Sequence, residues 1–183
     1  MSERFERSLI KLQARLRRFA YGLCGSLDEA DDLVQSAYER ALSREGQWRE
    51  GTRLDSWMYR IVQSIWYNQV NARKVRANYV ELVHSRPPEE MAEPERGEGA
   101  VTLDAVHRCI RDLPEEQRVA LLLVAVEGLS YKEVGSVLNV PVGTVTSRIA
   151  RARQAVKANM ESAAASRLTS PMTACDGGHK NAK

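Results

Sequence analysis

EGLSYKEVGSVLNVPVGTVTSRIARARQAVK, residues 127–157, is the stretch that decides the fold of the C-terminal half of the chain. Ser130 and Glu133 stand three residues apart, which is the spacing of a capping box at the start of a helix. A short helix is predicted over 131–138, where Asn139 suits the left-handed backbone conformation that closes it. Another helix is predicted to follow directly. Two short helices joined by a tight turn are typical of a helix-turn-helix, whose second helix lies in the major groove of DNA.

The second helix of this motif begins at Pro141 and has two different faces. The apolar residues recur at helical spacing and are predicted to be buried: Val145, Ile149, Ala152 and Val156. The opposite face is polar and basic near the start of the helix, where side chains can contact base edges and phosphates. The candidate DNA-binding residues are Thr144, Thr146, Ser147, Arg148 and Arg151, with Arg153 and Lys157 as further phosphate contacts. A basic run can also be a solvated helix face, but the turn in front of this one favours DNA binding.

The N-terminal part of the chain predicts three amphipathic helices. Apolar residues alternate in steps of three and four over 5–23, and Gly25 ends that pattern. A second helix is predicted over 26–41, and a third starts near Leu54 and extends to about Tyr79. The polar residues 43–51 are predicted to connect the second helix to the third.

Residues 82–100 contain prolines and glycines among many glutamates, so they are too polar and too interrupted to form a core. We therefore predict an all-α protein of two small helical domains joined by a flexible linker, with the helix-turn-helix in the C-terminal domain. The predicted N-terminal domain spans 1–81 and the C-terminal domain spans 101–160. The last helix is predicted to fade near Met160, and 161–183 to form a disordered tail.

The composition is that of a soluble, helix-rich protein that is not exported. The net charge of +3 is too small to indicate nucleic-acid binding by itself, so local clusters must carry that argument. The three cysteines, Cys24, Cys109 and Cys175, are not spaced as metal ligands or as a disulfide framework, which favours the reducing cytoplasm. No signal peptide and no apolar stretch of about 18 residues is present, so membrane insertion is not expected.

Several short motifs resemble those of one protein family. In the C-terminal half they are LPEEQR at 113–118, EGLSY at 127–131 and PVGTV at 141–145. In the N-terminal half they are DEADDLVQ at 28–35 and WMYRI at 57–61. These motifs resemble the extracytoplasmic-function (ECF) sigma factors of bacterial RNA polymerase, and the resemblance covers roughly residues 5–158. It implies a promoter-specificity subunit that directs core polymerase to promoters and helps to melt them, and that is not itself an enzyme.

The resemblance also implies which residues bind which partner. The polymerase-binding residues would be Asp31, Asp32 and Gln35. The residues for the minus-ten promoter element would be Arg60, Gln63, Ser64, Trp66, Tyr67, Asn68, Arg73 and Lys74, where a base flipped out of the duplex is held. The C-terminal candidates named above would bind the minus-thirty-five element. Acidic residues early in a helix are also favoured by the helix dipole alone, which is the simpler explanation for Asp31 and Asp32.

The third predicted helix mixes aromatic and cationic side chains, a combination suited to separated DNA strands. We expect Tyr59, Trp66 and Tyr67 to be available for stacking on bases, whereas Trp57 lies on the apolar stripe and is expected in the core. Ser64 stands where the family often has asparagine, and Thr146 where it often has a basic residue. Both departures bear on which promoter sequence is recognised, and neither changes the expected function.

Other functional classes receive less support. A stand-alone helix-turn-helix regulator would need a dimerisation or ligand-binding domain, and the N-terminal helices do not suggest one. A nucleic-acid-modifying enzyme is disfavoured because His84, His107 and His179 are scattered and no carboxylate cluster or phosphate-binding loop is present. No metal and no cofactor are therefore expected. The expected partners are core RNA polymerase, promoter DNA and an anti-sigma factor, and the free protein should bind DNA weakly.

Overall fold

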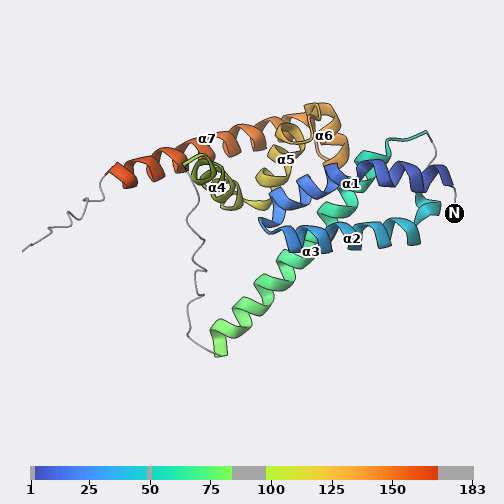
Figure 1. The fold of residues 1–183 in the computed structure, drawn as a ribbon, viewed down its shortest axis with the longest axis horizontal. Helices are drawn as coiled ribbons and strands as arrows, with labels where there is room; N and C mark the ends of the chain where they lie inside the picture. Colours follow the sequence, from blue (N-terminus) through green and yellow to red (C-terminus); the bar gives the residue numbers. More distant parts are fainter. Residues whose placement is uncertain (1–2, 49–50, 84–97, 169–183) are drawn as a thin grey trace, which may run out of the picture.

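The computed structural model describes the backbone of residues 3–48, 51–83 and 98–168, and the side chains of 3–48, 51–77 and 105–162. Within these residues the secondary structure is helical and no strand occurs (Figure 1). The α-helices are α1 (Glu3–Cys24), α2 (Leu27–Ser43), α3 (Leu54–Val83), α4 (Glu98–Arg111), α5 (Glu115–Ala125), α6 (Tyr131–Leu138) and α7 (Val142–Leu168), with a short 3-10 turn, η1 (Glu45–Gln47). The all-α fold class is confirmed.

Helices α1, α2 and α3 form the N-terminal domain. Gly25 ends α1 with a positive φ of 78°, and its N–H donates to the carbonyl of Tyr21 at 2.7 Å. That conformation is open to glycine at little cost, so the chain reverses here and α2 returns alongside α1. Ser26 caps α2, its hydroxyl accepting the N–H of Glu29. Leu16, Phe19 and Leu33 are fully buried between the helices.

Helix α3 crosses this pair and then leaves it. Met58 and Val62 in its first turns are fully buried, whereas the side chains from Arg73 to Ala77 are exposed. The C-terminal part of α3 accordingly projects away from the other helices (Figure 1). The helix ends at Val83, so residues 82–83 of the predicted linker belong to α3 and 98–100 belong to α4. The rest of that linker lies outside the described residues.

Helices α4 to α7 form the C-terminal domain and contain the predicted helix-turn-helix. The capping box of α6 is complete: the Ser130 hydroxyl accepts the Glu133 N–H, and the Glu133 carboxylate accepts the Ser130 N–H. Asn139 has the predicted left-handed conformation, with φ of 55°. The prediction that the last helix ends near Met160 is wrong, because α7 continues to Leu168. The remaining part of the predicted tail lies outside the described residues.

Replacing Ser130 with alanine should lower the free energy of unfolding by about 1 kcal/mol, because the first N–H groups of α6 lose their side-chain acceptor. Urea denaturation followed by circular dichroism measures this change. Ser136→Ala is the control, since that hydroxyl only donates to the carbonyl of Lys132 within the same helix. An equal loss in both variants would contradict a specific capping role.

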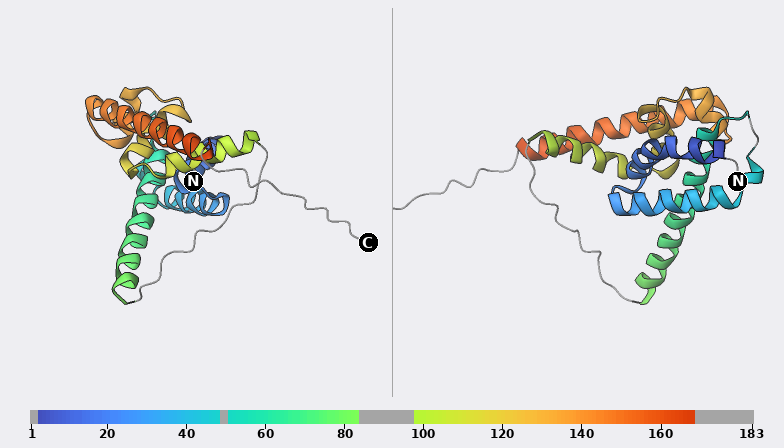
Figure 2. Two further views of the ribbon diagram at one scale, coloured as in Figure 1. Left: turned by 90° about the vertical axis from the view of Figure 1, so that its left-hand side faces the viewer. Right: turned by 45° about the vertical axis from the view of Figure 1, so that its right-hand side comes forward.

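The two domains pack against each other instead of lying apart. One continuous hydrophobic cluster includes Leu23 and Tyr59 of the N-terminal domain and Leu122 and Val134 of the C-terminal domain. Helix α1 lies so close to α5 that a Cβ atom added to Gly22 would be 2.7 Å from a methyl carbon of Leu122. Figure 2 shows α1 between α2 and the C-terminal helices. The sequence predicted only that a flexible linker joins the two domains. It did not predict that the domains pack against each other.

Candidate nucleic-acid and polymerase interfaces

The start of α7 carries the residues predicted to bind the minus-thirty-five element. Val145, Ile149 and Ala152 are buried, as expected, which fixes the orientation of the helix. Thr146, Ser147 and Arg151 are exposed on the opposite face, and Thr144 is half-buried beside them. The face of α7 predicted to contact DNA is therefore open to solvent.

Arg148 differs from its neighbours on this face. Its side chain is only 18% exposed and forms an ion pair with Glu116 at the start of α5. This contact anchors the recognition helix to the scaffold, so Arg151 is the more available cation for a base or phosphate. The hydroxyls of Thr146 and Ser147 donate to carbonyls one turn back in α7, at 3.0 Å each. They can exchange these weak local bonds for contacts with DNA.

The residues predicted to bind the minus-ten element lie along α3 but differ in accessibility. Ser64 and Asn68 are exposed, and Gln63 and Tyr67 are half-buried. Trp66 is only 3% exposed, and the guanidinium carbon of Arg118 lies 5.2 Å from its ring centroid. Burial raises the pKa of the Tyr67 hydroxyl, so this group remains a neutral donor at physiological pH.

The aromatic residues expected to stack on bases are mostly unavailable in this arrangement. Tyr59 is fully buried, and its ring meets Phe19 edge to face at a centroid distance of 5.2 Å. The expectation that Tyr59 is free to stack is wrong for this arrangement, because its hydroxyl is engaged with the C-terminal domain. Trp57, expected in the core, is only half-buried: it packs against the core near Phe5 and also lines a surface pocket.

The cations of the predicted minus-ten surface are all paired in the structure. Arg60 donates to the carbonyl oxygens of Ser136 at 2.8 Å and Val137 at 3.2 Å, both in α6. Arg73 pairs with Glu29 of α2 at 3.1 Å. Lys74 pairs with Glu115 of α5 at 2.6 Å. Two of the three cations are therefore held by the C-terminal domain.

A pocket beside Arg60 contains functional candidates that the sequence analysis missed. It has a volume of about 300 Å³ and is lined by Arg40, Arg44, Gln47, Trp57, Arg60, Ile61 and Ser64. Arg40 comes from the end of α2, Arg44 directly follows that helix, and Arg60 comes from α3. A pocket with an aromatic wall and several guanidinium groups suits one nucleotide, because the ring can stack on the base and the cations can bind its phosphates. The spacing of Arg40 and Arg44 by one helical turn is the sequence signal that could have indicated it.

The residues predicted to bind polymerase lie together on an exposed face of α2. Asp31 pairs with Arg17 of α1 at 2.6 Å, and the Gln35 amide donates to Glu39 at 3.2 Å. The Asp32 carboxylate has no partner among the described side chains, so it is the acid most available to a basic protein surface.

An apolar groove adjoins this acidic face. It is lined by Glu6, Leu9, Ile10, Gln13, Tyr38 and Leu42. Ile10 is 67% exposed and Leu42 is 39% exposed, which is unusual for large apolar side chains. An apolar patch with a polar rim is typical of a protein–protein interface.

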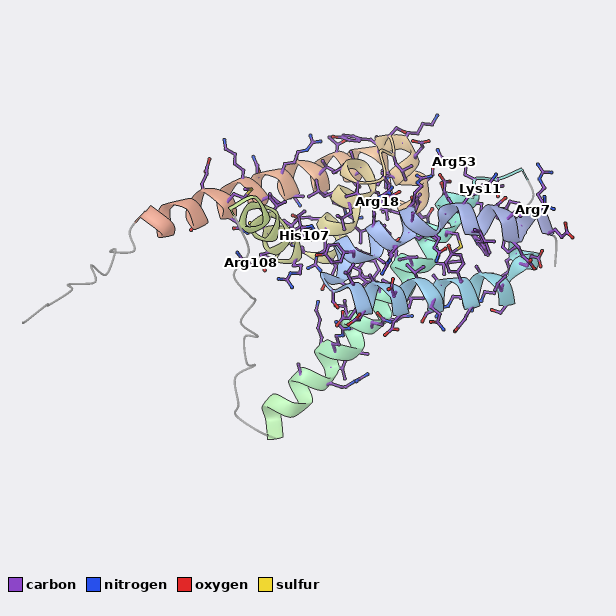
Figure 3. All side chains as sticks on the ribbon, viewed as in Figure 1. Arg7, Lys11, Arg18, Arg53, His107 and Arg108 are labelled. Atoms are coloured by element: carbon purple, nitrogen blue, oxygen red, sulfur yellow. The ribbon has the colours of Figure 1, made fainter. Side chains whose placement is uncertain are left out.

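Basic side chains are frequent along α1. Figure 3 shows Arg7, Lys11 and Arg18 along α1, with Arg108 of α4 toward the other end of the same view. Arg7 is neutralised by Glu3 at 2.6 Å, whereas Lys11 and Arg18 are exposed to solvent. The small net charge thus hides a local concentration of positive charge on α1.

The described residues contain no group of three or more histidine, cysteine or acidic side chains that could hold a metal ion. Cys24 and Cys109 are free thiols. Among residues 3–48, 51–83 and 98–168, no helix is both long and apolar enough to cross a bilayer.

Cys24 should be a slowly reacting thiol. Burial, assisted by the Glu29 carboxylate, raises its pKa to about 11. At pH 8 about one thousandth of the thiol is then ionised, and alkylation by iodoacetamide should be roughly 100-fold slower than for an exposed cysteine. The rate should rise as the pH approaches 11. Mass spectrometry of the modified peptide measures it, with the denatured chain as the control; equal rates in the two states would contradict this environment.

Comparison with known proteins agrees with this geometry. Residues 103–156 match the family model "Sigma-70, region 4", and residues 12–63 match the "Sigma2 domain of PhyR". The chain is 33% identical over 148 residues to the ECF RNA polymerase sigma factor EcfG of Rhodopseudomonas palustris, covering 78% of this chain and 77% of that one. It is 34% identical over 145 residues to the ECF RNA polymerase sigma factor SigE of Mycolicibacterium smegmatis, but spans only 56% of that protein's length and 78% of its own.

A solved structure has the same fold. The sigma factor RpoE of Bartonella quintana, in complex with the anti-sigma factor NepR, aligns with a TM-score of 0.74 and 25% identity, covering 87% of this chain and 98% of the other. The chain belongs to the ECF sigma factor family of bacterial RNA polymerase.

Proposed function

We propose that the protein binds core RNA polymerase, directs it to specific promoters and helps to open the DNA there. The observation that carries this proposal is that one chain presents two separate exposed surfaces, the reading face of α7 and the acidic face of α2. A stand-alone DNA-binding protein needs only the first of these. A subunit that brings polymerase to DNA needs both.

We assign the contact with core polymerase to Asp31, Asp32 and Gln35, together with the apolar groove around Ile10 and Leu42. The free carboxylate of Asp32 supplies charge complementarity to a basic partner, which favours fast and specific association. The apolar groove supplies surface that becomes buried on binding, which stabilises the complex. The polymerase carries out RNA synthesis, so this chain contributes binding energy and no catalytic group of its own.

We assign the minus-thirty-five element to Thr144, Thr146, Ser147, Arg148 and Arg151. We assign the minus-ten element to the polar side of α3 and to the pocket beside Arg60. An unpaired nucleotide in this pocket would be held outside the duplex, and its binding would favour the melted strand. Gln63, Ser64 and Asn68 lie along the same helix and offer hydrogen-bonding groups to the neighbouring bases.

Replacing Arg151 with alanine should weaken binding of the polymerase complex to promoter DNA about tenfold, because an exposed cation at the start of the recognition helix is lost. Fluorescence anisotropy with a labelled promoter fragment measures this. Arg7→Ala is the matched control, because Arg7 is exposed but paired with Glu3 at the far end of α1. Equal weakening by both variants would indicate a general charge effect and contradict the assignment.

An anti-sigma factor is the regulatory partner that we assign to this chain, because the Bartonella quintana sigma factor of the same fold was crystallised with one. The basic surface formed by Lys11 and Arg18 is complementary to acidic groups of such an inhibitor. A protein that works on RNA polymerase acts in the cytoplasm. Affinity purification of the tagged protein from its own cells, with and without the inducing stress, tests for a stable inhibitor complex.

Binding of the protein to labelled promoter fragments, measured with and without core polymerase, tests whether the α2 face binds polymerase while the α7 face binds DNA. We expect tight, sequence-specific binding only when core polymerase is present, because tethering raises the effective concentration of each DNA-binding surface. Tight binding by the free chain, with no effect of core polymerase, would contradict the proposal and indicate a stand-alone regulator.

A further inference from the structure

We propose that Thr146 of α7 is a specificity-determining residue, whose methyl group contacts the C5-methyl group of a thymine in the upstream promoter element. Thr146 can have this role only if α7 binds that element, so the proposal rests on the proposed function. It adds the identity of one base and the atoms through which that base is recognised.

Thr146 lies where the second helix of a helix-turn-helix contacts bases. Val145 and Ile149 are fully buried, so α7 cannot rotate about its axis without exposing them. Thr146 follows Val145 directly and is exposed. In this motif the residues near the start of the second helix are the ones that contact base edges in the major groove. Thr146 is therefore placed to contact a base.

The hydroxyl of Thr146 is already engaged within α7. It donates to the carbonyl of Val142, one turn earlier, at 3.0 Å. A threonine hydroxyl in this local bond is turned toward the backbone, which leaves the γ-methyl group as the part of the side chain that a ligand meets. A DNA contact through the hydroxyl requires this bond to be exchanged, whereas a contact through the methyl group does not.

The residues one turn before and one turn after Thr146 are also apolar. Val142 is 45% exposed, and Ala150 is exposed. Residues four apart lie on the same face of a helix, so these two side chains flank Thr146. Neither of them offers a hydrogen-bond donor or acceptor. A base edge that approaches Thr146 therefore meets an apolar surface.

Polar groups lie beside this surface on the same helix. Ser147 and Arg151 are exposed and stand one turn apart. A serine can bond to several bases, and an arginine suits the O6 and N7 atoms of guanine. The face of α7 thus offers hydrogen bonds next to a surface that offers none. The two parts suit different bases of one element.

Thymine is the base that presents a methyl group in the major groove, at its C5 atom. Adenine and guanine present nitrogen and oxygen atoms there, and cytosine presents an amino group. The methyl groups of threonine and alanine are suited to apolar contact with the thymine methyl. A base that offered only polar groups to Thr146 would lose water without gaining a hydrogen bond, which is unfavourable. The surface around Thr146 therefore favours thymine.

Removal of single methyl groups from the DNA tests this contact. A library of promoter fragments, selected with the protein bound to core polymerase, supplies an upstream element that is recognised. Each thymine of that element, on either strand, is then replaced singly by deoxyuridine, which lacks only the C5-methyl group. At one position the replacement should weaken binding by about fourfold, the effect of one buried methyl group, as measured by fluorescence anisotropy. Replacement of a thymine between the two promoter elements is the control and should have no effect.

Three variants separate the methyl group of Thr146 from its hydroxyl. Thr146→Ser keeps the hydroxyl and loses the methyl group, so it should bind the thymine and deoxyuridine fragments equally. Thr146→Val keeps a methyl group and loses the hydroxyl, so it should retain the fourfold preference of the wild type. Ser147→Ala is the matched control from the polar part of the face and should retain the preference as well. All three changes fall on exposed side chains and leave the buried face of α7 intact.

The reverse pattern, in which Thr146→Ser keeps the preference for thymine and Thr146→Val loses it, would overturn the proposal, because Thr146 would then act through its hydroxyl. Equal binding of all the deoxyuridine fragments by the wild-type complex would overturn it too. Failure of the proposed function is recognised at an earlier step. If the complex with core polymerase selects no fragment over random DNA, the proposed function is wrong and the thymine contact falls with it.

Discussion

Replacing Asp32 with arginine is expected to reduce promoter-specific transcription by more than about 100-fold, because a like-charge contact at an interface costs several kcal/mol. Asp32 is exposed on α2 and has no partner among the described side chains. Its replacement should therefore leave folding intact and act on docking alone. Transcription assays across a titration of the variant against core polymerase measure the loss.

The control for this substitution is Glu161→Arg, which makes the same charge change on an exposed position of α7. It should transcribe normally. Thermal unfolding of Asp32→Arg should match the wild type. A variant that is stable and fully active would contradict the assignment of the α2 face to polymerase.

Replacing Arg118 with alanine is expected to lower the free energy of unfolding by about 3 kcal/mol, because several buried carbonyl groups lose a charged donor together. Arg118 donates to the carbonyl of Leu23 at 3.0 Å and that of Leu113 at 3.1 Å, and also to the carbonyl of Arg111. It therefore joins the end of α1 to the start of α5. Desolvation by burial lowers its pKa, yet a guanidinium remains charged at physiological pH.

Urea denaturation measures this loss, with Arg153→Ala as the control because Arg153 is exposed on α7. Arg118→Lys should recover only part of the stability, since an ammonium group cannot reproduce the forked geometry of the guanidinium. A loss below about 1 kcal/mol in Arg118→Ala would place the residue among ordinary surface arginines and contradict its structural role.

The local elements could be predicted because their signals are short-range. Ser130 with Glu133 and the left-handed Asn139 specify the start and end of α6 through their own backbone contacts. The apolar period of α7 likewise specifies which face is buried, and so which residues remain for DNA. The end of α7 was placed too early because residues 161–167 lack large apolar side chains, although the alanines there favour a helix.

The contacts between the domains could not be predicted in this way. Glu127 stands beside Gly128 at the end of a helix, where an exposed carboxylate is the ordinary expectation. Its burial against Tyr59 depends on how two domains meet across a sequence separation of 68 residues, which no local pattern encodes. The pocket beside Arg60 could not be predicted either, because it forms only where the end of α2 approaches α3.

Run-off transcription with purified core polymerase, with and without this protein, on a library of promoter fragments is the most direct test of the central claim. The account predicts transcripts that begin at defined positions only when the protein is added, and that disappear with Asp32→Arg. Transcripts of the same pattern from core polymerase alone, or sequence-specific DNA binding by the protein without any transcript, would contradict it.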